Sequence, residues 1–163
     1  INEAVTGLIK KYNSSGKFHL IHGTGKSGYA AMMEALAGID LCPDFELREY
    51  ISDMDICMAA ADLVICRAGA ITLSELEACG KPSVLIPSPY VAENHQYHNA
   101  MTLKRAGCAE VIEEKNLSSD TLIKEVDELL SSPERLQTMA ENALKNAISD
   151  ANERIYGIIK DLL

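Results

Sequence analysis

The stretch from Arg67 to Glu77 holds the residues whose types and spacing are best suited to binding a phosphorylated ligand. It reads Arg-Ala-Gly-Ala-Ile-Thr-Leu-Ser-Glu-Leu-Glu and leads from an apolar run into a helical pattern that begins near Thr72. Gly69 and Ala70 are small enough to let a ligand approach the backbone closely. The free N–H groups and the positive dipole end of a helix start then suit a phosphate. The spacing of Thr72 and Glu75 also fits a capping box, in which Glu75 would only hold the helix start.

A second candidate lies between Pro87 and Asn99, where a proline-containing loop leads into a helix start rich in amide and imidazole side chains. Such neutral donors and acceptors suit sugar hydroxyls, and the amide of Gln96 can both donate and accept. The plain alternative is a merely polar helix N-terminus. His95 and His98 have the spacing of two metal ligands on one helix face, but no third ligand follows at a convincing spacing. We therefore expect neither a metal site nor a cofactor.

A third segment, His22-Gly23-Thr24-Gly25-Lys26-Ser27, ends like the phosphate-binding loop of nucleoside triphosphatases. That loop requires an earlier glycine five residues before Gly25, and Leu20 stands there instead, inside an apparent strand. The segment is therefore interpreted as a glycine-rich turn from a strand to a helix. Such a turn contacts a ligand in some proteins and only connects elements in others.

The elements that must position these segments alternate along the chain. Apolar runs predict five strands at Phe18–Ile21, Leu47–Ile51, Leu63–Cys66, Val84–Ile86 and Ala109–Ile112. Helical patterns are expected at Ile1–Tyr12, Tyr29–Leu36, Met54–Ala60, Thr72–Ala78 and Gln96–Arg105. Three more helices follow, with starts at Ser118, at Ser132-Pro133 and at the capping-box-like Asp150-x-x-Glu153.

This alternation predicts an α/β fold with a Rossmann-like, doubly wound parallel sheet. Ligands of such sheets bind beyond the carboxyl ends of the strands, which is where the three segments above fall. No linker or repeat interrupts the 163 residues, so we expect residues 1–163 to form a single domain. The first residue is Ile rather than Met, which we interpret as a segment of a longer protein.

Charge and composition exclude several classes of function. The formal net charge is −9, without a basic stripe to neutralise phosphates, so nucleic-acid binding is not expected. No apolar run approaches the roughly 18 residues of a membrane span, and the acidity argues against adhesion to an anionic membrane surface. The five cysteines are odd in number and never spaced as Cys-x-x-Cys, which is typical of reduced, mostly buried thiols in a cytosolic protein.

Taken together, these residues resemble the C-terminal domain of the MurG family of UDP-N-acetylglucosamine-dependent glycosyltransferases. The similarity covers essentially the whole chain. It rests on Glu49-Tyr50-Ile51, Ala61-Asp62, the run Arg67 to Glu75, Pro82, Ile86-Pro87, Asn94-His95-Gln96, Asn99-Ala100, Leu103, Ala106-Gly107 and Ala109. The run Arg-x-Gly-Ala-x-Thr-x-x-Glu together with the later His-Gln pair is specific, whereas neither is specific alone.

The resemblance implies the GT-B architecture, in which two Rossmann-like domains face each other and the second binds the nucleotide sugar. It implies that the backbone of Ile51 meets uracil and that Glu75 accepts the ribose hydroxyls. The amides of Ala70, Ile71 and Thr72 would face the diphosphate, and His95 and Gln96 the N-acetylglucosamine (GlcNAc). Arg67 and Gly69 belong to the same substrate-binding run.

The same resemblance implies the reaction of the intact enzyme. GlcNAc would pass from UDP-GlcNAc to a lipid-linked MurNAc-pentapeptide, with inversion, in peptidoglycan synthesis at the cytoplasmic face of the bacterial plasma membrane. Relative to the family, this chain begins after the first strand and its glycine-rich loop, and it lacks the N-terminal domain that would hold the acceptor and the catalytic base. We therefore expect no catalytic residue here and little activity from this part alone.

Two other interpretations stay open on the sequence. One is a separately encoded donor-binding subunit of another lipid-linked GlcNAc transferase, which would work with a partner chain. The other is a non-catalytic module of α/β fold that binds a nucleotide sugar or has a regulatory role. A sugar epimerase that shares the GT-B architecture is a weaker option.

Overall fold

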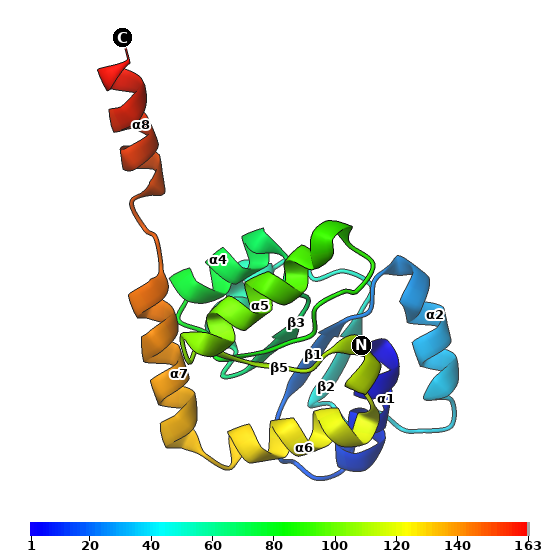
Figure 1. Cartoon of the computed structure of the whole chain (residues 1–163). Coiled ribbons are helices and arrows are strands. Elements are labelled where there is room, and N and C mark those ends of the chain that lie inside the picture. The colour runs from blue at the N-terminus through cyan, green and yellow to red at the C-terminus, as the bar shows by residue number, and fades with distance from the viewer. Residues whose placement is uncertain (163) are drawn as a thin grey trace. The chain divides into compact units, whose positions relative to one another are not determined.

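Helices and strands alternate along the chain in the computed structural model, which describes residues 1–162 (Figure 1). The first half contains α1 (Asn2–Tyr12), β1 (Leu20–Gly23), α2 (Lys26–Ala35), β2 (Phe45–Arg48), α3 (Met54–Ala60), β3 (Val64–Cys66) and α4 (Ala70–Ala78). The second half contains β4 (Ser83–Leu85), η1 (Ala92–Asn94), α5 (His95–Arg105), β5 (Ala109–Val111), η2 (Glu114–Asn116), α6 (Ser119–Leu130), α7 (Pro133–Asn146) and α8 (Ala151–Asp161). Every strand pairing among these residues is parallel, so the expected α/β class is confirmed.

The chain divides into two compact units, which are described separately. Residues 1–61 and 112–133 form the first unit, and residues 62–111 and 134–162 form the second. The prediction of a single domain over residues 1–163 is not tested by this division and stays a prediction.

In the first unit, β1 and β2 form a parallel pair, and α1 packs against α6 (Figure 1). The core between these two helices consists of apolar side chains that recur at helical spacing: Leu8 and Ile9 on α1, and Leu122, Val126 and Leu129 on α6. Because β1 pairs with β2 from Leu20↔Phe45 to Gly23↔Arg48, the second strand ends at Arg48. The predicted strand Leu47–Ile51 was therefore too late in the chain, and Ile51 lies in the loop that follows.

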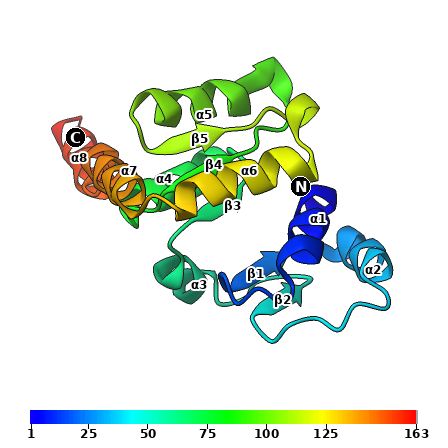
Figure 2. The same ribbon diagram turned by 90° about the horizontal axis from the view of Figure 1, so that it is seen from below.

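In the second unit, three parallel strands pair in the order β3-β4-β5. The central strand β4 is wholly buried, as is Ile86 directly after it. Figure 2 shows α5 running alongside β5. Leu76 of α4 and Cys108, just before β5, complete this core. The parallel pairing brings the carboxyl ends of β3 and β4 to one edge of the sheet, which is where the first two candidate segments begin.

The helix starts test the predicted capping signals. Ser118 caps α6, because its hydroxyl accepts from the N–H of Thr121, and Pro133 is the first residue of α7, so both predictions are confirmed. The capping box at Asp150 is wrong. Asp150 stands at the N-cap of α8 but its side chain caps nothing, and its carboxylate pairs instead with Arg154 at 2.9 Å.

The five cysteines are all unpaired, but they are less buried than the sequence predicts. Only Cys108 is buried, while Cys79 is exposed and the other three are half-buried. Burial raises the pKa of the Cys66 thiol to about 12, so this side chain is a neutral thiol at neutral pH.

Candidate functional site

The site in the second unit is built from the two loops that leave the carboxyl ends of β3 and β4. Arg67 follows β3 directly, and its guanidinium Nη1 donates to the carbonyl oxygen of Ile86, which follows β4, at 3.2 Å. This hydrogen bond ties the start of one loop to the start of the other. Arg67 is half-buried, and through this contact its side chain supports the two loops.

The start of α4 presents backbone N–H groups that no side chain caps. Gly69 is the N-cap in an extended conformation (φ −69°, ψ 142°), and the helix begins at Ala70. The N–H groups of Ala70, Ile71 and Thr72 have no hydrogen-bond acceptor within residues 1–162. Three aligned donors at the positive end of the helix dipole form a suitable surface for a phosphate oxygen.

Gly69 keeps the approach to these donors open. Its φ is one that any residue adopts, so backbone strain does not require glycine here. A Cβ at this position would meet nothing closer than the Thr72 hydroxyl at 4.0 Å, which leaves free space above the turn. That Gly69 lets a ligand approach the backbone closely stays a prediction, with which this free space is compatible.

The alternative role for Glu75, as a member of a capping box, is wrong. Because α4 begins at Ala70, Thr72 is the third residue of the helix and Glu75 the sixth, beyond the reach of the N-cap. The Glu75 side chain is exposed and has neither a hydrogen bond nor an ion pair within the described residues. It lies one turn beyond the unpaired N–H groups, on the same helix face as Ile71, whose side chain is 77% exposed.

The loop after β4 orients the two polar side chains at the start of α5. The amide oxygen of Gln96 accepts from the N–H of Ser88 at 2.9 Å, and Nδ1 of His95 lies 2.9 Å from the carbonyl oxygen of Ala92. Between these contacts the backbone passes through Glu93 and Asn94, both with φ of 51°. Non-glycine residues rarely adopt this left-handed conformation, so the loop has a defined and strained path. Ser88 was not singled out from the sequence, because its contribution is a backbone group.

In the first unit, Ile51 lies beside the carboxyl end of β1. Its side chain lies against Gly23, where a Cβ would be 3.4 Å from the nearest carbons of Ile51. Its backbone N–H and C=O have no hydrogen-bond partner within residues 1–162. An unpaired donor and acceptor on one residue are what the edge of a uracil base would need. Ile51 belongs to the first unit, whereas the other predicted site residues lie in the second.

The glycine-rich turn His22 to Gly28 is held by Asn2, a residue to which the sequence pattern gave no role. The Asn2 amide donates to the carbonyl of Thr24 at 2.9 Å, and its oxygen lies 3.0 Å from Nε2 of His22. Burial, and secondarily the positive N-terminus, lower the pKa of His22 to about 4, so its ring is neutral at neutral pH. Helix α2 begins at Lys26, three residues before the predicted start, because Gly25 with φ 73° ends the turn there.

Two classes of site are not found among the described residues. No cluster of three or more His, Cys, Asp or Glu side chains has a geometry that could hold a metal ion within residues 1–162. In that same part of the chain, every helix is too short or too polar to cross a lipid bilayer.

Comparison with known proteins identifies relatives of this arrangement. The family model described as "Glycosyltransferase family 28 C-terminal domain" matches residues 1–155. A protein of Acetivibrio thermocellus, named UDP-N-acetylglucosamine--N-acetylmuramyl-(pentapeptide) pyrophosphoryl-undecaprenol N-acetylglucosamine transferase, is 50% identical over 163 residues. A protein of the same name from Ruminiclostridium cellulolyticum is 41% identical over 164 residues. Both alignments cover 100% of this chain but only 44% and 45% of the relatives, so the chain spans less than half of their length.

Solved structures resemble the fold over most of its length. The crystal structure of Acinetobacter baumannii MurG superposes with a TM-score of 0.83 at 26% identity, over 98% of this chain and 45% of that one. The glycosyltransferase VinC, in complex with dTDP, superposes with a TM-score of 0.68 over 86% of this chain and 32% of that one. At 15% identity the second likeness concerns the fold alone.

Proposed function

The chain belongs to the family of glycosyltransferase family 28 C-terminal domains, and from this premise we propose that it binds UDP-GlcNAc as the sugar donor of a GlcNAc transferase. The uncapped start of α4 is the observation that carries the proposal. Three N–H groups and, one helical turn further on, an exposed carboxylate have no partner among the residues that the structure describes. A nucleoside diphosphate offers the complementary groups in that order, since its phosphates accept hydrogen bonds and its ribose hydroxyls donate them.

The remaining site residues fit the other parts of such a donor. The unpaired backbone of Ile51 suits the edge of uracil, and the polar side chains of His95 and Gln96 suit the hydroxyls of GlcNAc. Glu75 would accept the ribose hydroxyls, with Gly69 leaving room for the diphosphate and Arg67 supporting the two loops.

The chemical contribution of this part is stabilisation of the leaving group. When the bond from GlcNAc to UDP breaks, negative charge develops on the diphosphate, and fixed N–H donors stabilise that charge without reorganising. The acceptor hydroxyl and the base that deprotonates it would belong to the rest of a longer protein. We propose that the acceptor is a lipid-linked MurNAc-pentapeptide and that the whole enzyme works on the cytoplasmic face of the bacterial plasma membrane.

Calorimetric titration of the chain with UDP, UDP-GlcNAc and ATP tests the proposal. Both uridine nucleotides should bind, with ATP roughly tenfold weaker or worse. Tighter binding of ATP, or no binding of either uridine nucleotide, would refute the donor assignment.

A proline substitution tests the role of the helix start within the same experiment. Ala70→Pro removes one of the unpaired N–H groups at the first helical position, which tolerates proline. Loss of a hydrogen bond to a charged phosphate should weaken UDP binding by about 10- to 100-fold. Ser119→Pro is the matched control, because it makes the same change at the first residue of α6, whose start is already capped by Ser118. Equal UDP affinity in the two variants would show that the α4 donors do not hold the diphosphate.

A further inference from the structure

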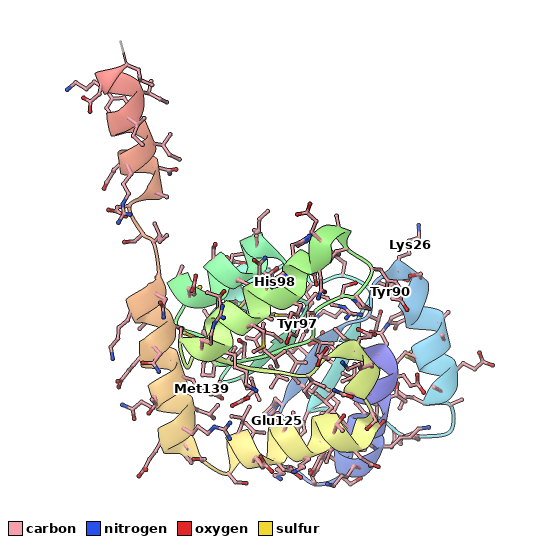
Figure 3. All side chains as sticks on the ribbon, viewed as in Figure 1. Lys26, Tyr90, Tyr97, His98, Glu125 and Met139 are labelled. Carbon is pink, nitrogen blue, oxygen red and sulfur yellow. The ribbon has the colours of Figure 1, made fainter. Side chains whose placement is uncertain are left out.

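Tyr90 lies in the loop that leads from β4 into α5, and it is 90% exposed (Figure 3). We call residues 89–94 of this loop the strap. Within the strap, Val91 is half-buried and the other five residues are exposed. The side chains of Tyr90, Glu93 and Asn94 form no hydrogen bond or ion pair with any residue from 1 to 162. Side-chain packing therefore does little to hold the strap in the position that the structure shows.

The strap lies between two well-fixed points. Before it, the backbone N–H of Ser88 donates to the amide oxygen of Gln96 at 2.9 Å, and after it the chain enters α5, which contacts β5. Inside the strap, the N–H of Tyr90 lies 3.3 Å from the Ser88 hydroxyl oxygen. The N–H of Asn94 lies 3.4 Å from the carbonyl oxygen of Val91. Both distances are long for hydrogen bonds, so the strap is held mainly at its ends.

The last two residues of the strap are strained. Glu93 (φ 51°, ψ 21°) and Asn94 (φ 51°, ψ 31°) are both left-handed, although a Cβ disfavours this conformation. The shorter contact at this turn, 2.9 Å from the Ala92 carbonyl oxygen to Nδ1 of His95, involves an exposed ring. Right-handed dihedral angles would relieve the strain and add both residues to the start of α5. Residues 93 and 94 thus form a hinge between two conformations of the strap.

A second large apolar side chain is exposed on the neighbouring loop. Ile71, in the first turn of α4, is 77% exposed. The two loops are joined where they begin, because the guanidinium of Arg67 donates to the carbonyl oxygen of Ile86 at 3.2 Å. Ile71 follows Arg67 by four residues, and Tyr90 follows Ile86 by four. Four extended residues span at most roughly 14 Å, so the tip of the strap can reach the start of α4.

From these observations we infer that the strap is a lid: when the donor binds, residues 93 and 94 become right-handed and Tyr90 closes over the start of α4, against Ile71. The inference rests on the proposed binding of UDP-GlcNAc and adds to it a step that covers the site. Relief of the strain and burial of two exposed apolar side chains favour closure. Without a donor, closure would desolvate the unpaired N–H groups of α4, which favours the open strap in the free chain.

Substitutions at the hinge test this coupling. Glycine adopts the left-handed conformation freely, whereas alanine resists it. Glu93→Gly with Asn94→Gly should hold the strap open and weaken UDP-GlcNAc binding by roughly tenfold, because fewer molecules are closed. Glu93→Ala with Asn94→Ala should favour the closed strap and tighten binding by roughly threefold or more. Calorimetric titration measures both dissociation constants.

The control for the hinge variants is an exposed asparagine in a right-handed helix. Asn152→Gly and Asn152→Ala on α8 make the same exchanges where no left-handed residue is involved, and they should leave the affinity for UDP-GlcNAc unchanged. Equal affinities of the glycine pair and the alanine pair at the hinge, or tighter binding by the glycine pair, would refute the lid.

A fluorescent reporter tests the movement itself. The sequence contains no tryptophan, so Tyr90→Trp places a single one at the tip of the strap. Saturating UDP-GlcNAc should shift its emission to shorter wavelength and reduce its quenching by acrylamide. Ile71→Ala in the same protein should lessen this protection. Tyr156→Trp on α8, where the tyrosine is 69% exposed, is the control and should not respond. A strap reporter that is quenched equally with and without bound donor would contradict closure.

Measurements without ligand separate a failure of this inference from a failure of the proposed function. In the free Tyr90→Trp chain, the alanine pair at the hinge should protect the reporter from acrylamide more than the glycine pair does. Equal quenching would refute the hinge even if calorimetry shows that UDP-GlcNAc binds. If the quenching differs as expected and UDP-GlcNAc does not bind, the donor assignment fails, and with it closure over a donor.

Discussion

The hydroxyl of Tyr12 on α1 donates to the carboxylate of Asp127 on α6, at 2.6 and 2.5 Å from its two oxygens. Two ammonium groups complete the contact, since Lys17 lies 2.6 Å and Lys11 3.3 Å from the same carboxylate. The ring of Tyr12 is buried, and the ammonium groups of Lys11 and Lys17 lie 4.9 and 5.0 Å from its centroid. The hydrogen bond from Tyr12 to Asp127 thus joins α1 and α6 through residues that are 115 positions apart in the sequence. Asn2, which holds the glycine-rich turn, belongs to α1. The turn is therefore attached to a pair of helices that ion pairs and apolar packing both stabilise.

Removing the tyrosine hydroxyl should destabilise the chain measurably. Tyr12→Phe keeps the buried ring but deletes a hydrogen bond to a charged group. We expect a loss of about 1 kcal/mol in the free energy of unfolding, the low end of the usual range because the carboxylate stays partly exposed. Urea denaturation measures the loss. Glu128→Gln, an exposed carboxylate on the same helix that only faces Lys124 at 3.8 Å, is the control and should change little.

The same cluster gives the stability a dependence on acid pH. Hydrogen bonds from Lys17 and Tyr12, with a further one from Lys11, lower the pKa of Asp127 to about 2 from an ordinary value of 3.8. A depressed carboxyl pKa stabilises the folded state above pH 3.8, and this contribution is lost as the pH falls from 3.8 towards 2. Asp127→Asn should be less stable than the parent at pH 6, and the difference should shrink below pH 3. A difference that is constant with pH would rule out the charge as its source.

Gly7 is required by the packing of α1 against α6. A Cβ at Gly7 would lie 2.0 Å from the hydroxyl oxygen and 2.3 Å from the Cβ of Ser119, so a substitution must displace the start of α6. Gly7→Ala should therefore cost about 1–3 kcal/mol in spite of the better helix propensity of alanine. The control is Gly157→Ala in α8, where a Cβ meets nothing within 4 Å and only the helix propensity changes. A stabilised Gly7→Ala variant in urea denaturation would disprove the close contact.

The helices and strands could be predicted from the sequence because their apolar residues recur at the spacing typical of each kind of element. Within residues 1–162, the five strands and the eight α-helices were expected, whereas the short helices η1 and η2 were not. Ser118 and Pro133 marked helix starts correctly because their local chemistry suffices. The start of α4 was placed two residues late, since its N-cap Gly69 has no capping side chain to announce it. The spacing of Thr72 and Glu75 matched a capping box without forming one.

Features that depend on the path of the backbone were not predictable. Ile51 extended an apolar run, but the strand ended earlier because its partner β1 ended at Gly23. The left-handed residues Glu93 and Asn94 are not glycines and gave no signal. The Gln96 contact with Ser88 joins a side chain to a main-chain N–H eight residues away, which only the folded loop brings together.

His22 should make the chain less stable below neutral pH. Its pKa falls from 6.5 in the unfolded chain to about 4 in the folded one, chiefly by burial. As the pH drops from 6.5 towards 4, the unfolded state binds a proton that the folded state refuses, so stability is lost over this window. We expect a loss on the order of 1 kcal/mol between pH 7 and pH 5, reduced by the partial exposure of the ring.

The replacement His22→Gln isolates this effect. Glutamine can still donate to the Asn2 oxygen, but it does not titrate. The variant should lose less stability than the parent between pH 7 and pH 5 in urea denaturation. His19→Gln, at an exposed histidine three residues earlier, is the control and should follow the parent curve. Parallel curves for His22→Gln and the parent would mean that another group titrates in this window.

Glu75 should contribute to ligand affinity and not to stability. Its position at the sixth residue of α4 excludes a capping role, and its exposed carboxylate has no partner in the described part of the chain. If it accepts the two ribose hydroxyls, Glu75→Gln should weaken UDP binding by roughly 1–3 kcal/mol while the melting temperature stays unchanged. Glu77→Gln is the matched control, because side chains two residues apart on a helix do not lie on the same face, so Glu77 should not affect UDP. Calorimetry and thermal melting on both variants decide the matter, since a Glu75→Gln variant that binds UDP like the parent would exclude the ribose contact.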